Sequence, residues 1–154
     1  MTRYLVLLGI VMLTSACAGR LGVVPYAPMS ARGGYQEEEV RPGVWRVLAR
    51  SSAKADEGHA WNMAEYRAGE LLKARGFSHL QMLDRNGRWE LSGQLGGGRR
   101  RVLSEAMEVT VRGAHDPSPP TDCHAPNSAS CSTLNIEAMM AGIRPRLKFG
   151  KGKF

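Results

Sequence analysis

A run of three glycines followed by three arginines offers anion-binding chemistry. Residues 96–101 read Gly-Gly-Gly-Arg-Arg-Arg, so free backbone N–H groups would lie beside three guanidinium groups, an arrangement that can hold a phosphate. A nucleotide-binding glycine loop also needs a preceding strand and a following Lys-Ser or Lys-Thr pair, and both are missing here. Two interpretations stay open, a solvated basic loop and an anion site formed by Arg99, Arg100 and Arg101.

Cys17 follows three small residues at the end of an apolar segment. Arg3 carries the only charge before an uncharged run from Leu5 to Leu13, and Thr14-Ser15-Ala16 precede the cysteine. This order is typical of a cleavable secretory signal. As a helix, the uncharged run would span about 14 Å, roughly half the hydrocarbon core of a bilayer, so it is too short to be a stable membrane span.

The segment from Leu13 to Cys17 resembles the lipobox of bacterial prolipoproteins, with Thr14 as a mild departure because leucine is commoner there. The resemblance implies cleavage before Cys17, a diacylglycerol on its sulfur and an acyl chain on its new amino group. Ala18, where an aspartate would signal retention, implies export to the outer membrane. Ordinary cleavage that leaves a free Cys17 is the alternative, although an unpaired thiol is a liability in an oxidising compartment. We therefore expect a domain anchored by lipid to the outer membrane and facing the periplasm.

Lipidation of Cys17 would leave Cys123 and Cys131 as an even pair. Two cysteines that close a short loop in an exported protein favour a disulfide. The alternative is a metal site with ligands drawn from Cys123, His124, Cys131, His115 and Asp122. Zinc takes about four deprotonated ligands in tetrahedral order, and this spacing is not a recognised zinc pattern. We predict the disulfide, and neither a metal nor another cofactor.

The remaining reactive side chains form no catalytic pattern in the sequence. His59 and His79 fall on different predicted elements, and no serine stands in a nucleophile motif near either of them. Several methionines recur at core spacing, which indicates packing and not copper binding. We therefore predict that the protein is not an enzyme.

Three stretches have the pattern of strands. Residues 43–50 place Trp45, Val47 and Ala49 on one side, residues 77–83 are apolar on both sides, and residues 107–112 alternate cleanly between apolar and polar. Long loops rich in glycine or proline are expected at 85–103 and 113–132. The pattern predicts a short, mainly antiparallel sheet of three to four strands.

One main helix is predicted from Asp56 to Arg75, and Asn135 is expected to cap a short C-terminal helix over residues 136–143. The apolar arc of the main helix would pack on the sheet, and Arg67 falls inside that arc. Either the stem of Arg67 packs while its guanidinium reaches solvent, or the guanidinium meets a carboxylate. The candidate carboxylates are Asp84, Glu37, Glu38 and Glu39.

The motifs Val44-Trp45-Arg46-Val47, Tyr66 to Leu71, Gly76-Phe77 and Leu83-Asp84-Arg85 occur in this order over roughly residues 35–85. This order resembles a family of small proteobacterial outer-membrane lipoproteins of unknown function. More loosely, the layout looks like the small α+β lipoproteins of envelope stress sensing. The family resemblance implies a structural salt bridge between Arg67 and Asp84. Neither resemblance implies an enzyme activity.

The expected organisation is a signal peptide at 1–16, a lipidated cysteine with a flexible tether at 17–34, a single two-layer α+β domain at 35–147 and a basic tail at 148–154. The chain has a formal net charge of +7, which would attract anionic lipid headgroups and other envelope polyanions. Nucleic acid is a poor partner, since no recognition motif is present in the sequence.

Two functions follow from these expectations. The first is a lipid-anchored envelope lipoprotein with a structural role or a role in binding an envelope protein. The second is a periplasmic binding module for anionic lipid or lipopolysaccharide, which would use Arg99, Arg100 and Arg101.

Overall fold

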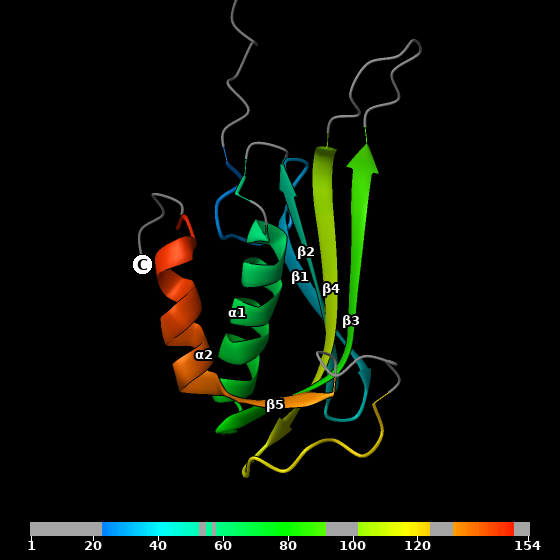
Figure 1. Ribbon diagram of the computed structural model, residues 1–154, viewed down its shortest axis with the longest axis vertical. Coiled ribbons are helices and arrows are strands. Elements are labelled where there is room, and N and C mark those ends of the chain that lie inside the picture. The colour runs from blue at the N-terminus through cyan, green and yellow to red at the C-terminus, as the bar shows by residue number, and fades with distance from the viewer. Residues whose placement is uncertain (1–22, 53–54, 57, 92–101, 124–130, 150–154) are drawn as a thin grey trace, which may run out of the picture.

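The computed structural model describes residues 23–52, 55–56, 58–91, 102–123 and 131–149 (Figure 1). Within these residues, five strands, two α-helices and a short 3₁₀ helix follow one another. Their bounds are β1 Gly34–Arg41, β2 Val44–Ser52, α1 His59–Lys73, β3 His79–Leu91, β4 Val102–Ala114, β5 Ser132–Asn135, α2 Ile136–Ile143 and η2 Arg144–Arg146.

The strands form one antiparallel sheet in the order β1-β2-β4-β3-β5. Both α-helices lie on the same side of this sheet, so the predicted α+β class is confirmed (Figure 1). The sheet has five strands where three to four were expected. The two additional strands are β1, which has three consecutive glutamates, and the four-residue β5, which follows the Pro-rich stretch.

The core lies between the sheet and α1. From Ser104 to Arg112 on β4 the exposure of the side chains alternates, with Met107, Val109 and Val111 fully buried and the residues between them half-buried. α1 contributes small and medium side chains at helical spacing, so it packs closely over β2 and β4. The buried α1 residues in this layer include Ala60, Met63, Ala64, Ala68 and Leu72.

The start of α1 is capped by a residue from a distant strand. The N-cap residue Gly58 has no side chain to offer, but the buried carboxylate of Glu105 on β4 accepts a hydrogen bond from the Ala60 N–H at 3.3 Å. A carboxylate at this position also complements the positive end of the helix dipole. α1 starts three residues later than Asp56, and Gly76 beyond its end has a left-handed φ of 85°.

The N-terminal segment before β1 packs on the domain, so the prediction of a flexible tether through residue 34 is wrong from residue 24 onward. Val24 is buried, and its carbonyl lies 3.0 Å from Nε2 of the buried His59. Tyr26 N–H donates to the Lys148 carbonyl at 2.8 Å, so the two ends of the described chain lie side by side. The folded domain therefore begins about ten residues before the predicted boundary.

The predicted loop at 85–103 is also wrong at both ends, because β3 runs to Leu91 and β4 starts at Val102. Asn86-Gly87 has the pattern of a hairpin turn, yet Gly87 lies inside the strand. A Cβ on Gly87 would approach the Met107 sulfur at 2.6 Å and Trp61 at 3.2 Å. Gly87 is therefore needed for packing and not for a turn.

The disulfide between Cys123 and Cys131 is present, with Cα atoms 5.6 Å apart. It links the residues on either side of the segment 124–130. The chain before it lies against the far end of the sheet, where the Ser118 carbonyl accepts hydrogen bonds from Gln81 at 2.9 Å and Thr133 at 2.7 Å. Among the described residues, no helix is long and apolar enough to cross a membrane.

Candidate functional site

The predicted site residues fall into two groups. Cys17 and the arginines at 99–101 lie outside the described residues. Arg67 and Asp84 are described, but they do not pair. Asp84 is opposite Thr110 on the face of the sheet away from α1, and its carboxylate accepts from the Arg85 N–H and from Asn86. The sheet therefore separates Asp84 from the helix that carries Arg67.

Arg67 instead binds two other carboxylates. Its guanidinium donates to both oxygens of Glu37 on β1, at 2.6 and 3.2 Å, and to Glu70 one turn along α1 at 3.1 Å. The hydrogen bond to Glu37, which is the largest effect, raises the pKa of Arg67. One of the predicted alternatives, Glu37, is thus the true partner.

Aromatic rings enclose this ion-pair cluster. The Arg67 guanidinium lies 4.9 Å from the centre of the Tyr35 ring, and the Tyr26 hydroxyl donates to Glu70. Burial, with this hydrogen bond adding to it, raises the pKa of Tyr26. Every charge in the cluster has a partner within it, so the cluster fixes β1 and the N-terminal segment to α1 and serves a structural purpose.

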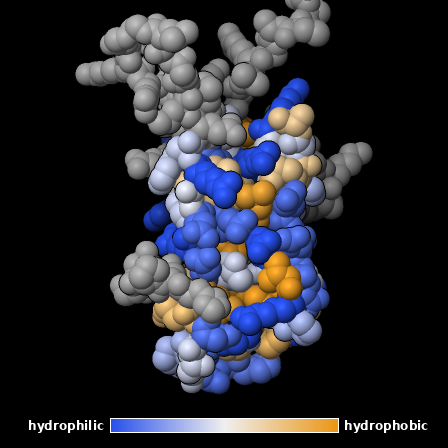
Figure 2. Space-filling view, turned by 90° about the vertical axis from the view of Figure 1, so that its right-hand side faces the viewer, coloured by the Kyte–Doolittle hydropathy of each residue, from blue (hydrophilic) through white to orange (hydrophobic). Residues whose placement is uncertain are grey.

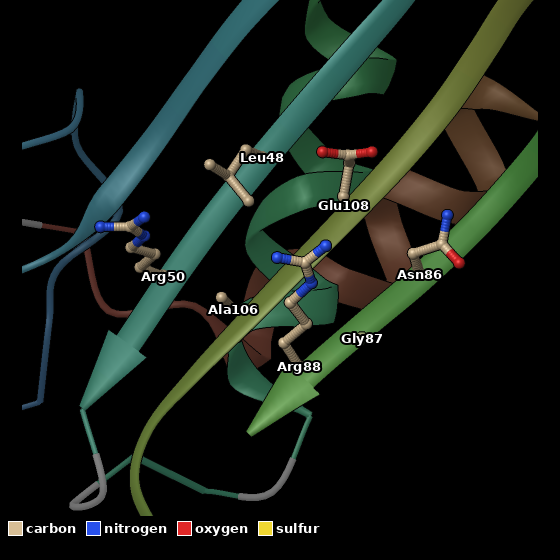
Figure 3. Close-up of a pocket in the computed structure, with 7 residues that line it drawn as sticks. All are labelled: Leu48, Arg50, Asn86, Gly87, Arg88, Ala106 and Glu108. Carbon is tan, nitrogen blue, oxygen red and sulfur yellow. The ribbon is translucent and has the colours of Figure 1, made fainter. Parts of the chain in front are cut away.

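The opposite face of the sheet is covered by neither helix (Figure 1). Figure 2 views the molecule from the side on which Figure 1 shows the strands, and the described surface there is mainly hydrophilic with separate hydrophobic areas. A hollow of about 430 Å³ lies on this face between β2, β4 and β3 (Figure 3). It is lined by Leu48, Arg50, Asn86, Gly87, Arg88, Ala106 and Glu108.

The floor of the hollow is low because a small residue stands between two long ones. Ala106 on β4 is opposite Arg50 on β2 and opposite Arg88 on β3. Residues two strands apart in one row have backbones about 10 Å apart, and the two arginine side chains stand on either side of Ala106 (Figure 3). An anion smaller than this spacing could contact both guanidinium groups.

Some of the arginines around the hollow form ion pairs with described residues and others do not. In the neighbouring rows Arg46 binds Glu38 at 2.7 Å and approaches Glu108 at 3.5 Å, so its charge is already balanced. Within the described part of the chain, neither Arg50 nor Arg88 forms an ion pair, and both are exposed. No described carboxylate therefore balances the charge of these two arginines.

The chemistry of the lining suits binding. Guanidinium groups recognise phosphate and carboxylate through pairs of parallel hydrogen bonds, while Asn86 both donates and accepts, and Glu108 accepts from hydroxyl groups. The described lining contains no serine, cysteine or histidine that could act as a nucleophile or base. His59 is buried against the Val24 carbonyl, and His79 bonds to Ser78 Oγ.

The sequence contained a partial signal for this site. Leu48 and Arg50 are the residues that alternate with the apolar side of β2, so a solvent-facing row was predictable there. Arg88 and Asn86 were missed because they fell in the stretch assigned to a loop. The described residues contain no group of three or more His, Cys, Asp or Glu side chains that could hold a metal ion.

Comparisons with known proteins do not identify a family for this chain. A scan of protein-family models, a search of curated proteins and a search of solved structures each gave no match.

Proposed function

We propose that this protein is an outer-membrane lipoprotein, held by acyl chains on Cys17 and facing the periplasm, which acts by binding and not by catalysis. The support for the anchor is the lipobox-like sequence from Leu13 to Cys17 behind a short apolar segment. Two or three acyl chains anchor a protein firmly, whereas one chain binds only marginally.

The observation that carries the binding function is the pair of exposed arginines, Arg50 and Arg88, on either side of the hollow. Their unbalanced charge favours an anionic envelope component, such as a phosphate-bearing lipid headgroup or lipopolysaccharide. Arg99, Arg100 and Arg101 lie between β3 and β4 in the sequence, and Arg101 directly precedes Val102. They would add positive charge near the same strand ends.

The short link to the lipid supports this ligand class. Only the residues between Cys17 and Val23 separate the lipid from the described domain, so the link spans at most about 20 Å when fully extended. The start of the described chain and the ends of β3 and β4 that lead into the hairpin lie at the same end of the molecule (Figure 1). A domain held in this way would keep its basic hairpin close to the membrane surface.

The binding function is tested by titrating the detergent-solubilised mature lipoprotein with lipopolysaccharide in a calorimeter at low and high salt. Replacing both Arg50 and Arg88 by alanine should weaken binding at least about tenfold, because each charge-assisted hydrogen bond is worth about 1.5–3 kcal/mol. Arg46→Ala is the matched control, since Arg46 is already paired, and it should have little effect. Equal affinity of the double variant and the wild type would refute the site.

The basic loop and the anchor have separate tests. Alanine at Arg99, Arg100 and Arg101 should reduce the salt dependence of the same binding, because fewer charges are neutralised on association. Mass spectrometry of the mature N-terminus should find Cys17 with diacylglycerol and an amide-linked acyl chain. A free Cys17, or an uncleaved signal, would refute the anchor without bearing on the hollow.

A further inference from the structure

Among the described residues, no strand pairs with the outer edge of β3 over its second half. β4 pairs with β3 along its whole length from His79 to Leu91, but β5 pairs only with residues 79–82 (Figure 1). From Asp84 to Trp89, no described residue pairs with the other side of the strand. Every second residue of an edge strand directs its N–H and C=O away from the sheet, so this stretch offers hydrogen bonds to another strand.

The other edge of the sheet is protected differently. On β1, Tyr35 is already bonded to the N-terminal segment, because Met29 N–H donates to the Tyr35 carbonyl at 2.7 Å and Tyr35 N–H donates to the Ala27 carbonyl at 2.9 Å. Beyond this contact β1 carries glutamates at 37–39. Residues 84–89 of β3 contain no proline and carry charges of both signs, and no described segment is bonded to this edge as the N-terminal segment is to β1.

Aromatic surface borders this outer edge on the side of the sheet that carries α1. Trp89 is 59% exposed, the highest value among the large hydrophobic side chains described. Trp61 of α1 reaches over Gly87, and the Arg85 guanidinium stacks on the Trp61 ring at 4.3 Å. Since Gly87 has no side chain, an apolar residue of an added strand would find Trp61 and Trp89 beside it.

The opposite side of the same edge carries Asp84, Asn86 and Arg88, and the Asp84 carboxylate already accepts hydrogen bonds from Asn86 and from the Arg85 N–H. Arg88 is exposed on that side and has no described ion-pair partner, whereas Arg85 on the helix side is already neutralised by Glu65 at 2.6 Å. A strand laid along β3 places alternate side chains on opposite faces. Apolar residues would therefore meet the tryptophans, and acidic residues would meet Arg88 in a chain whose net charge is +7.

We propose that the outer edge of β3, from Asp84 to Trp89, binds an extended segment of another protein that alternates apolar and acidic residues, and so adds a sixth strand to the sheet. Backbone hydrogen bonds would supply much of the affinity, and the side-chain pattern would supply the specificity. The added strand and the ligand of the hollow would share Arg88, but Trp89 faces away from the hollow and Arg50 lies two strands from the edge, so variants at Trp89 and Arg50 separate the two sites.

The probe is a synthetic peptide of alternating valine and glutamate, labelled for fluorescence anisotropy and titrated into the mature lipoprotein in neutral detergent. Two further peptides carry N-methyl groups on one or the other set of alternate residues. Only one set of N–H groups of an added strand faces β3, so one methylated peptide should lose binding and the other should keep it. Equal binding of the two methylated peptides, or no binding of the parent peptide, would overturn the proposal.

Surface variants locate the contact. Trp89→Ala should weaken peptide binding about three- to fivefold, as expected for the loss of one cross-strand aromatic contact. Val40→Ala removes the other large exposed hydrophobic residue, which lies on the opposite edge strand, and should leave the affinity unchanged. Arg50→Ala should weaken binding of lipopolysaccharide but not of the peptide, so failure at one site can be told from failure at the other.

Hydrogen exchange tests whether the edge is free. Amides of residues 84–89 that exchange rapidly alone and slowly with the peptide would support the proposal. Slow exchange of all these amides in the isolated monomer would overturn it, because another part of the same chain would then cover the edge. Protection that rises with protein concentration would also overturn it, since the occupant would then be a second copy of this chain.

Discussion

Arg67 is the residue at which the sequence and the structure disagree most sharply about a partner, and the two possibilities predict different stabilities. Arg67→Met keeps a packed stem but removes three hydrogen bonds to carboxylates, two to Glu37 and one to Glu70. Fully buried bonds of this kind contribute about 1.5–3 kcal/mol each. The side chains are 24–33% exposed, so solvent screening reduces their sum to about 2 kcal/mol.

A loss of about 2 kcal/mol corresponds to a fall in Tm of about 4–8 °C for a domain of this size. Urea and thermal unfolding of the disulfide-intact protein would measure it. Asp84→Asn should change stability by less than about 0.5 kcal/mol, because Asp84 has no contact with Arg67 and asparagine keeps an acceptor for the Arg85 N–H. A larger loss for Asp84→Asn than for Arg67→Met would refute the assignment. A double-mutant cycle should find coupling between Arg67 and Glu37 and none between Arg67 and Asp84.

Three further predictions concern stability. Burial and the bond to Glu70 raise the pKa of Tyr26 above its usual 10.0. The stabilising effect of the neutral Tyr26 is therefore complete below pH 10, and above pH 10 the free energy of unfolding falls by up to about 1.4 kcal/mol per pH unit. Tyr26→Phe should reduce this alkaline loss of stability in urea titrations, and an unchanged dependence on pH would show that Tyr26 does not cause it. Gly113→Ala would force a Cβ into the Phe77 ring and should lower the free energy of unfolding in urea by about 1–3 kcal/mol. Gly142→Ala is the control, because a Cβ there meets open space. Equal stability of the two variants would contradict the packing of Phe77 against Gly113. Replacing both disulfide cysteines by serine should cost about 2–3 kcal/mol, and thiol titration that finds two free thiols in the oxidised wild type would argue against the bond.

The sequence predicted those helices and strands whose position depends on neighbouring residues in the chain. α2 begins and ends as expected, because the Asn135 side chain accepts from the Ala138 N–H at 3.0 Å and an apolar run follows the cap. β4 was recognised from its alternation of apolar and polar residues, since one face of that strand is buried. These features depend on neighbours in the sequence, so they can be read without tertiary information.

Features that depend on distant partners could not be predicted. β1 lacks an apolar alternation because Glu37, on its helix side, is balanced by Arg67 and not by hydrophobic packing. Gly87 has the pattern of a turn, and only the positions of Met107 and Trp61 show why glycine stands within a strand. The hollow was missed for the same reason, since its two arginines are brought together by strand pairing.

The attachment of the N-terminal segment determines how the domain would carry mechanical load. Force on the N-terminal end of the described chain is first met by the bonds of Val24 to His59 and of Tyr26 to Lys148 and Glu70, which belong to α1 and to the C-terminal part of the chain. Tension therefore reaches α1, near its start and near its end, before it reaches β1. Force applied at the N-terminal end would thus not peel the sheet from its first strand before these bonds break.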